Sequence, residues 1–133
     1  MRGIDISHHN SWPFNAATAA AYKESDFVII KATQGTYYDD TTYFKKAVEL
    51  VLKDNKLAGA YHYANGTDAI EEADYFVSIV KPYLGKIVLA LDWETSTSAA
   101  GKNTAWGNKS YAKQFMDRVY EKTGVRCLLY TGM

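Results

Sequence analysis

Short apolar segments alternate with amphipathic segments along the whole length of this 133-residue chain. Five of the apolar segments are rich in β-branched and aromatic residues, so we expect strands at 3–7, 27–33, 57–63, 87–94 and 125–131. Between them, apolar residues repeat at helical spacing and predict helices over 14–22, 44–52, 73–84 and 112–120. This alternation favours a parallel sheet with right-handed crossovers, because each helix returns the chain to the same end of the sheet. The expected fold is a single α/β domain over residues 1–133.

The fourth predicted strand ends in two acids one residue apart, Asp92 and Glu94. Alternate side chains of a strand point to the same face, which places the two Cβ atoms ~6.5–7 Å apart. Trp93, between them, is expected to point toward the helices. Adjacent carboxylates repel, so one of them tends to keep its proton near neutral pH. A proton donor beside a carboxylate anion is what a glycosidase needs, whereas the structural alternative is a salt-bridged strand end or a helix cap.

Polar side chains also stand at the ends of the other predicted strands. Parallel α/β sheets hold their functional sites at the carboxyl ends of the strands, so these side chains are expected to converge with the acidic pair. The residues concerned are Asp5, Ser7, Lys31, Thr33, Tyr61, Tyr63 and Tyr130.

Three candidates have structural alternatives. Asp5 could bind only loop amides, but it has the strand parity of the acidic pair and is expected at the site. Lys31 is expected to be the partner of a buried carboxylate rather than a Schiff-base amine. Trp106 lies in the longest loop, 95–109, which is expected to form a lip over a cleft. Its ring either stacks on a sugar or fills the loop.

His8 and His9 raise the alternative of a metal site. The further ligands of such a site would be Asp5, His62, Asp92 and Glu94. However, side chains of consecutive residues diverge, whereas zinc hydrolases space their histidines so that both face the metal. No metal and no organic cofactor is therefore expected, and a metal-dependent hydrolase stays as an alternative.

The charges of the chain balance, with 15 acidic and 15 basic residues. No charge field therefore draws it to nucleic acid or to an anionic membrane, and neither partner is expected. Cys127 is the only cysteine, which excludes a disulfide framework, and it is expected to be a small buried residue. The sequence enters its first strand without a signal peptide, so we expect synthesis in the cytoplasm, where the protein stays unless another factor releases it.

Four segments in this order resemble glycoside hydrolase family 25, the phage and bacterial muramidases often called lysozymes. They are residues 2–7 (RGIDIS), 28–35 (VIIKATQG), 59–64 (GAYHYA) and 91–94 (LDWE). The resemblance extends over the whole chain and implies a β/α barrel. The implied activity is cleavage of the β-1,4 bond between N-acetylmuramic acid and N-acetylglucosamine, and the implied partner is bacterial cell-wall peptidoglycan.

The resemblance also implies roles for individual residues. Glu94 matches the general acid, and Asp92 matches the carboxylate that steers or stabilises the acetamido group of the substrate. Asp5 matches an acidic residue on the cleft floor, and Tyr61 and Tyr63 match the aromatic lining. Substrate assistance and water attack with inversion both remain open as mechanisms.

Two departures from the family are visible. Gln34 stands where the family often has Glu, near the rim. The family barrel has eight strands, whereas this chain supplies five, so we expect an incomplete barrel with five parallel strands and four helices. Its open edges predict either association between copies or a truncated product of a longer gene. The missing strands also leave a second functional alternative, a wall-binding remnant that does not turn over.

Overall fold

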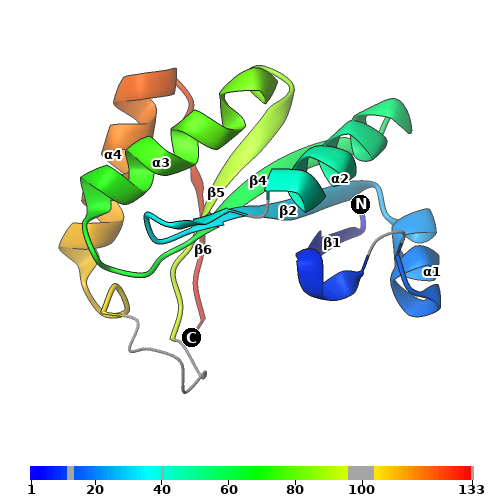
Figure 1. Ribbon diagram of the computed structural model, residues 1–133, viewed down its shortest axis with the longest axis horizontal. Coiled ribbons are helices and arrows are strands. Elements are labelled where there is room, and N and C mark those ends of the chain that lie inside the picture. The colour runs from blue at the N-terminus through cyan, green and yellow to red at the C-terminus, as the bar shows by residue number, and fades with distance from the viewer. Residues whose placement is uncertain (12–13, 40, 96–103, 133) are drawn as a thin grey trace.

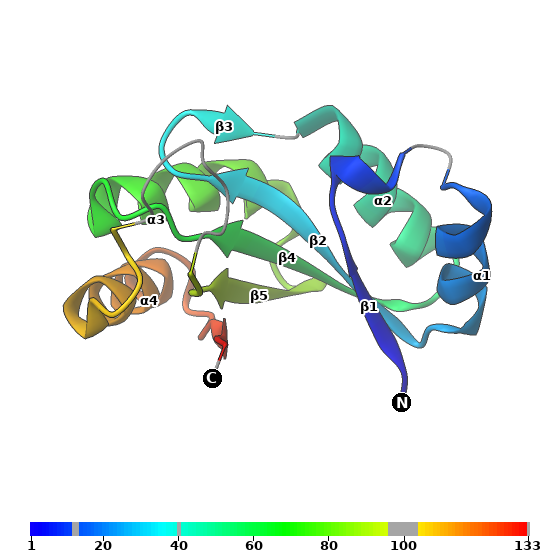
Figure 2. The same cartoon turned by 90° about the horizontal axis from the view of Figure 1, so that it is seen from below.

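The computed structural model describes residues 1–11, 14–39, 41–95 and 104–132, and its α/β architecture confirms the expected fold class. Five parallel strands form the curved sheet of a half-barrel, and their order along it follows the chain (Figures 1 and 2). These strands are β1 (Gly3–Ile6), β2 (Phe27–Gln34), β4 (Leu57–Tyr63), β5 (Ile87–Asp92) and β6 (Leu128–Tyr130). The four helices are α1 (Ala16–Glu24), α2 (Thr41–Lys53), α3 (Ala69–Val80) and α4 (Lys109–Thr123).

Helices α2, α3 and α4 lie on one side of the sheet, and α1 lies at its β1 end (Figures 1 and 2). One aromatic ring from each of these three helices is fully buried in the core: Phe44, Phe76 and Phe115. They pack with alternate strand residues, among them Ile30 and Leu89. This packing covers the convex face of the sheet and leaves the concave face for the polar strand ends.

Two helix boundaries are each set by a single residue. The Asp68 carboxylate caps α3 by accepting the backbone N–H groups of Ile70 and Glu71, both at 2.9 Å. Gly124 ends α4 in the left-handed conformation, with φ of 71°.

Several elements differ from the sequence-based expectation. A two-residue strand, β3 (Tyr38–Asp39), pairs antiparallel with the end of β2 and was not predicted. Strand β5 ends at Asp92 and β6 covers only three residues, so both are shorter than expected. Two short 3₁₀ turns follow β1 and α3, η1 (His8–Asn10) and η2 (Lys81–Tyr83). Hydrophobic patterning does not encode such short elements.

The concave face has an apolar part and a polar part. Leu57, Val88 and Leu128 lie toward the amino ends of their strands and are exposed. Among the described strands, β1 and β6 each keep one unpaired side. Association between copies through these edges stays a prediction. Within the described ranges, no helix is long and apolar enough to cross a membrane.

Candidate active site

A cleft of about 510 Å³ lies on the concave face and reaches the carboxyl ends of all five parallel strands. It brings together eight of the ten residues that the sequence placed at the site. They are Asp5, Ser7, Lys31, Tyr61, Tyr63, Asp92, Glu94 and Tyr130. His9 lines the same cleft.

The register of the sheet explains this convergence. Lys31 pairs with Tyr61 across β2 and β4, and Asp92 lies between Tyr63 and Tyr130 on its two neighbouring strands. Because side chains two residues apart share a face, Lys31, Tyr61, Tyr63, Asp92 and Tyr130 all reach the same concave surface. Segments far apart in the sequence thus contribute to one surface.

Asp92 is half-buried in the cleft, and its Oδ1 atom is buried with no hydrogen-bond partner among the described residues. Burial raises the pKa of Asp92 to about 7, and the nearby charges of Glu94 and Asp5 add to this rise while Lys31 opposes it. Asp92 therefore holds a proton close to neutral pH, which an exposed aspartate does not.

Glu94 lines the same cleft but follows the end of β5 rather than lying within it. The backbone N–H of Trp93 donates to the carbonyl of Tyr130 at 2.9 Å, so contact with β6 continues for one residue past Asp92. The Trp93 ring is half-buried and packs against the core. The two carboxylates consequently face one cavity while the residue between them faces away.

Lys31 is held among neutral polar and aromatic groups. Its Nζ atom donates to Oε1 of Gln34 at 2.7 Å and lies 5.2 Å from the ring centroids of both Tyr38 and Tyr63. Its positive charge lowers the pKa of Asp92, as expected for a counter-charge near a carboxylate.

Tyr61 is a neutral hydroxyl at the centre of the cleft. Burial raises its pKa, and the negative charges of Asp92, Asp5 and Glu94 raise it further. A phenol in these surroundings keeps its proton, so it can donate a hydrogen bond to a polar ligand.

The remaining aromatic candidate, Trp106, does not line the cleft. Its ring centroid lies 5.3 Å from that of Trp93, on the opposite side of the chain from the acids. Most of the predicted lip, residues 96–103, lies outside the described residues.

The histidines separate into two places. The ring of His8 lies 2.6 Å, through Nδ1, from the Tyr38 hydroxyl, and His9 lines the cleft rim. His62 is fully buried on the helix side of β4. Within the part of the chain that the structure describes, no group of three or more His, Cys, Asp or Glu side chains could hold a metal ion.

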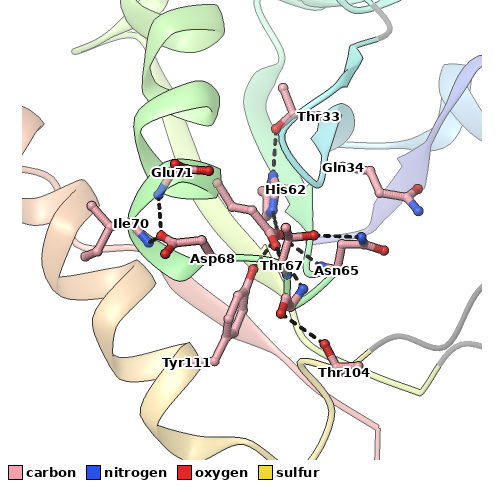
Figure 3. Close-up of polar contacts among 12 residues, drawn as sticks. Thr33, Gln34, His62, Asn65, Thr67, Asp68, Ile70, Glu71, Thr104 and Tyr111 are labelled. Atoms are coloured by element: carbon pink, nitrogen blue, oxygen red, sulfur yellow. Dashed lines mark hydrogen bonds and ion pairs between the residues drawn. The ribbon is translucent and has the colours of Figure 1, made fainter.

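Sequence reasoning missed a buried carboxylate, Glu72 of α3, which is fully inaccessible to solvent. Its Oε2 atom accepts the hydroxyl of Tyr111 at 2.6 Å and lies 2.8 Å from Nε2 of His62. Both oxygens also accept backbone N–H groups of the turn after β4, at residues 65–67 (Figure 3). The available signal was the position of Glu72 four residues before Phe76, which continues the apolar face of the helix predicted over 73–84 beyond its amino end.

The network fixes the charge states of its members. Burial lowers the pKa of His62, so the ring is neutral. Burial acts to raise the pKa of Glu72, but hydrogen bonds from His62, Tyr111 and Asn65 outweigh it and hold that pKa below its ordinary value. A neutral His62 that donates from Nε2 to Glu72 accepts at Nδ1 the hydroxyl proton of Thr33, 2.8 Å away.

Thr33 therefore does not belong to the cleft where the sequence placed it. The pairing of β2 with β4 shifts register between Lys31 and Thr33, which is a β-bulge. The extra residue turns the Thr33 side chain to the helix side, where it is buried against His62. Strict alternation along β2 predicted the opposite face.

A family model described as "Glycosyl hydrolases family 25" matches residues 4–133. The N,O-diacetylmuramidase of Chalaropsis sp is 30% identical over 142 residues, which cover 99% of this chain and 66% of that protein. The autolytic lysozyme of Clostridium acetobutylicum is 32% identical over 137 residues, which cover 98% of this chain and 38% of that protein. The chain thus spans less than the full length of the curated relatives it matches.

Solved structures give the same picture. The muramidase from Trichobolus zukalii superposes with a TM-score of 0.75 at 26% identity, covering 98% of this chain and 64% of that one. The bacterial lysozyme from Streptomyces coelicolor superposes with a TM-score of 0.76 at 25% identity, covering 97% of this chain and 61% of that one.

Proposed function

Because the chain belongs to glycosyl hydrolase family 25, we propose that it hydrolyses the glycan strands of bacterial peptidoglycan. The proposed bond is the β-1,4 link from N-acetylmuramic acid to N-acetylglucosamine. The observation that carries the proposal is the pair Asp92 and Glu94 in one cleft, where burial and mutual repulsion raise the pKa of Asp92 to about 7. A pair of acids that keeps one proton near neutral pH can protonate a leaving group.

The proposed roles follow the family resemblance and the proton that the pair retains. In the free protein this proton rests on Asp92, whose pKa is about 7. When substrate is bound, we assign the proton to Glu94, which donates it to the glycosidic oxygen and leaves Asp92 as the anionic neighbour. The buried Oδ1 atom of Asp92 is an acceptor for an N–H group such as that of a sugar acetamide. Asp5, Lys31 and the tyrosines line the rest of the cleft and bind the sugar rings and their polar groups.

Product analysis tests this proposal. Purified peptidoglycan is digested in the presence of EDTA, the products are reduced with borohydride, and their ends are identified by mass spectrometry. We expect every new reducing end to be N-acetylmuramic acid. New ends on N-acetylglucosamine would contradict the proposed bond, and activity that EDTA abolishes would favour the metal-dependent alternative.

We also propose where the protein meets its substrate. A protein with this activity meets its substrate only after release or secretion from the cell that makes it. If the 133-residue chain binds insoluble walls but releases no product, that result would favour a wall-binding role instead.

The raised pKa of Asp92 predicts that Asp92→Asn changes the free energy of unfolding by an amount that depends on pH. The folded carboxyl has a pKa of about 7, whereas an unfolded one titrates near 3.8. The native state therefore binds more protons between these values, so the free energy of unfolding falls as pH rises through this window and stays low above it. Asn carries no charge and avoids this cost.

We expect Asp92→Asn to raise the free energy of unfolding at pH 8 by about 1–3 kcal/mol and to leave it nearly unchanged at pH 4. The full shift corresponds to ~4 kcal/mol, and solvent screening of the half-buried group reduces it. Urea denaturation at the two pH values measures the difference. Asp117→Asn, on the exposed face of α4, is the matched control and should change stability by less than about 0.5 kcal/mol. Equal effects of Asp92→Asn at both pH values would contradict a raised pKa.

A further inference from the structure

The turn between β4 and α3 is fixed from inside by the Glu72 carboxylate. Its Oε1 atom accepts the backbone N–H groups of Gly66 at 2.9 Å and Thr67 at 2.7 Å, and its Oε2 atom accepts that of Asn65 at 3.0 Å. Three consecutive amides converge on one buried anion, so the turn has little freedom to move.

The outer side of this turn binds the segment that leads into α4. The carbonyl of Asn65 accepts the backbone N–H of Thr104 at 3.1 Å, and the carbonyl of Gly66 accepts the Thr104 hydroxyl at 2.9 Å (Figure 3). Gly66 has φ of 90°, and a Cβ atom there would lie 2.3 Å from the backbone nitrogen of Ala105. The two segments therefore interlock at a distance that only glycine allows.

Ala105 then connects this interlock to the residue between the two acids. Ala105 is fully buried, and its carbonyl accepts the indole N–H of Trp93. Strand β5 ends at Asp92, so the course of the chain beyond Asp92 depends on how Trp93 is held. Besides packing against the core, Trp93 is held by its indole bond to Ala105, its ring contact with Trp106 and its backbone bond to Tyr130.

We propose that Trp93 and Thr104 form a positioning latch that fixes Glu94 relative to Asp92, with the turn at residues 65–67 as its anchor. This role rests on the proposed function, because it concerns the geometry of the same acidic pair. Neither latch residue needs to touch substrate. Both act through the backbone direction that carries Glu94 into the cleft.

Two variants test the latch by kinetics. Trp93→Phe keeps an aromatic ring but removes the indole donor, and Thr104→Val keeps the shape of an exposed side chain but removes its hydroxyl donor. We expect kcat to fall about 10- to 100-fold for Trp93→Phe and about 3- to 10-fold for Thr104→Val, because small misplacements of a reacting group are costly. KM should stay within about twofold, since the binding surface is retained.

A double variant separates a loss of Glu94 positioning from a general loss of activity. In Glu94→Gln protein the acid is already absent, so adding Trp93→Phe should cause no further loss of residual activity. Thr42→Val, on the exposed face of α2, is the matched control for Thr104→Val and should leave kcat unchanged. Wild-type kcat in both latch variants, or a further loss in the Glu94→Gln background, would overturn the proposal.

A measurement without turnover keeps the latch and the proposed function apart. The Asp92 pKa is followed by carboxyl carbon NMR in wild type, Glu94→Gln and Thr104→Val. The negative charge of Glu94 helps to raise the pKa of Asp92. Glu94→Gln removes this charge, and Thr104→Val moves it away from Asp92, so both variants should lower the pKa of Asp92. We expect the Asp92 pKa to fall by about half a unit or more in Thr104→Val. An unchanged Asp92 pKa in Thr104→Val refutes the latch even if wild type proves inactive on cell walls. Absence of wild-type activity refutes only the proposed function.

Discussion

Glu94→Gln is expected to lower kcat for peptidoglycan hydrolysis by about 10²–10⁴-fold, the usual loss when a general acid is removed. Gln has nearly the shape of Glu, so KM should change little. Release of soluble fragments from dye-labelled walls gives the rates, and mass spectrometry confirms that the same products form. Glu121→Gln is the matched control, because Glu121 is an exposed acid on α4 that contacts Arg118 and does not line the cleft.

Equal rates for wild type and Glu94→Gln would remove the proposed role of Glu94. The pH dependence provides an independent check on the pair. Because the pKa of Asp92 is raised to about 7, the pair holds its proton below this pH and loses it above. Activity should therefore decline above pH 7, by about tenfold per pH unit at the limit of a single ionisation.

The largest expected effect on stability belongs to Glu72→Ala, a change far from the reacting groups. Its carboxylate is fully buried and accepts hydrogen bonds from His62, Tyr111 and the three turn amides. Removing it leaves these donors without an acceptor in the interior. Loss of one partner from such a buried network costs about 3–5 kcal/mol of unfolding free energy.

Urea denaturation followed by circular dichroism measures this loss. Glu71→Ala, one residue earlier on the exposed side of α3, is the control and should cost about 0.3–1 kcal/mol through the helix dipole alone. The contribution of Glu72 should also weaken at low pH. Its folded pKa is lowered, so its stabilisation is present above the ordinary value of 4.5 and is lost as pH falls below that. A Glu72→Ala protein as stable as Glu71→Ala would show that the network contributes little.

The sequence sufficed for the parts of this molecule that depend on periodicity. Strand parity placed Asp5, Lys31, Tyr61 and Asp92 on one face, and the structure brings all four into one cleft. Family membership agrees with the four motifs from which the resemblance was drawn. Their catalytic and binding roles stay predictions.

Features that break periodicity could not be predicted in this way. The bulge in β2 shifts the alternation by one residue and sends Thr33 to the buried side, and no local residue pattern marks that shift. Glu72 was overlooked because an acid inside a helix is normally solvated, and its partners come from 10 and 39 residues away along the chain. The Trp106 ring contacts Trp93 and does not line the cleft. This is a tertiary contact between residues 13 apart in the sequence, and residue spacing does not reveal it.

The concave surface has a consequence for handling and engineering this protein. Its acids and tyrosines lie toward one end of the strands, whereas Leu57, Val88 and Leu128 expose hydrocarbon toward the other. Exposed hydrocarbon and the acidic cleft thus occupy different parts of one sheet face. Replacing Leu57, Val88 and Leu128 with threonine or lysine would therefore remove exposed apolar surface and leave the acids and tyrosines of the cleft in place.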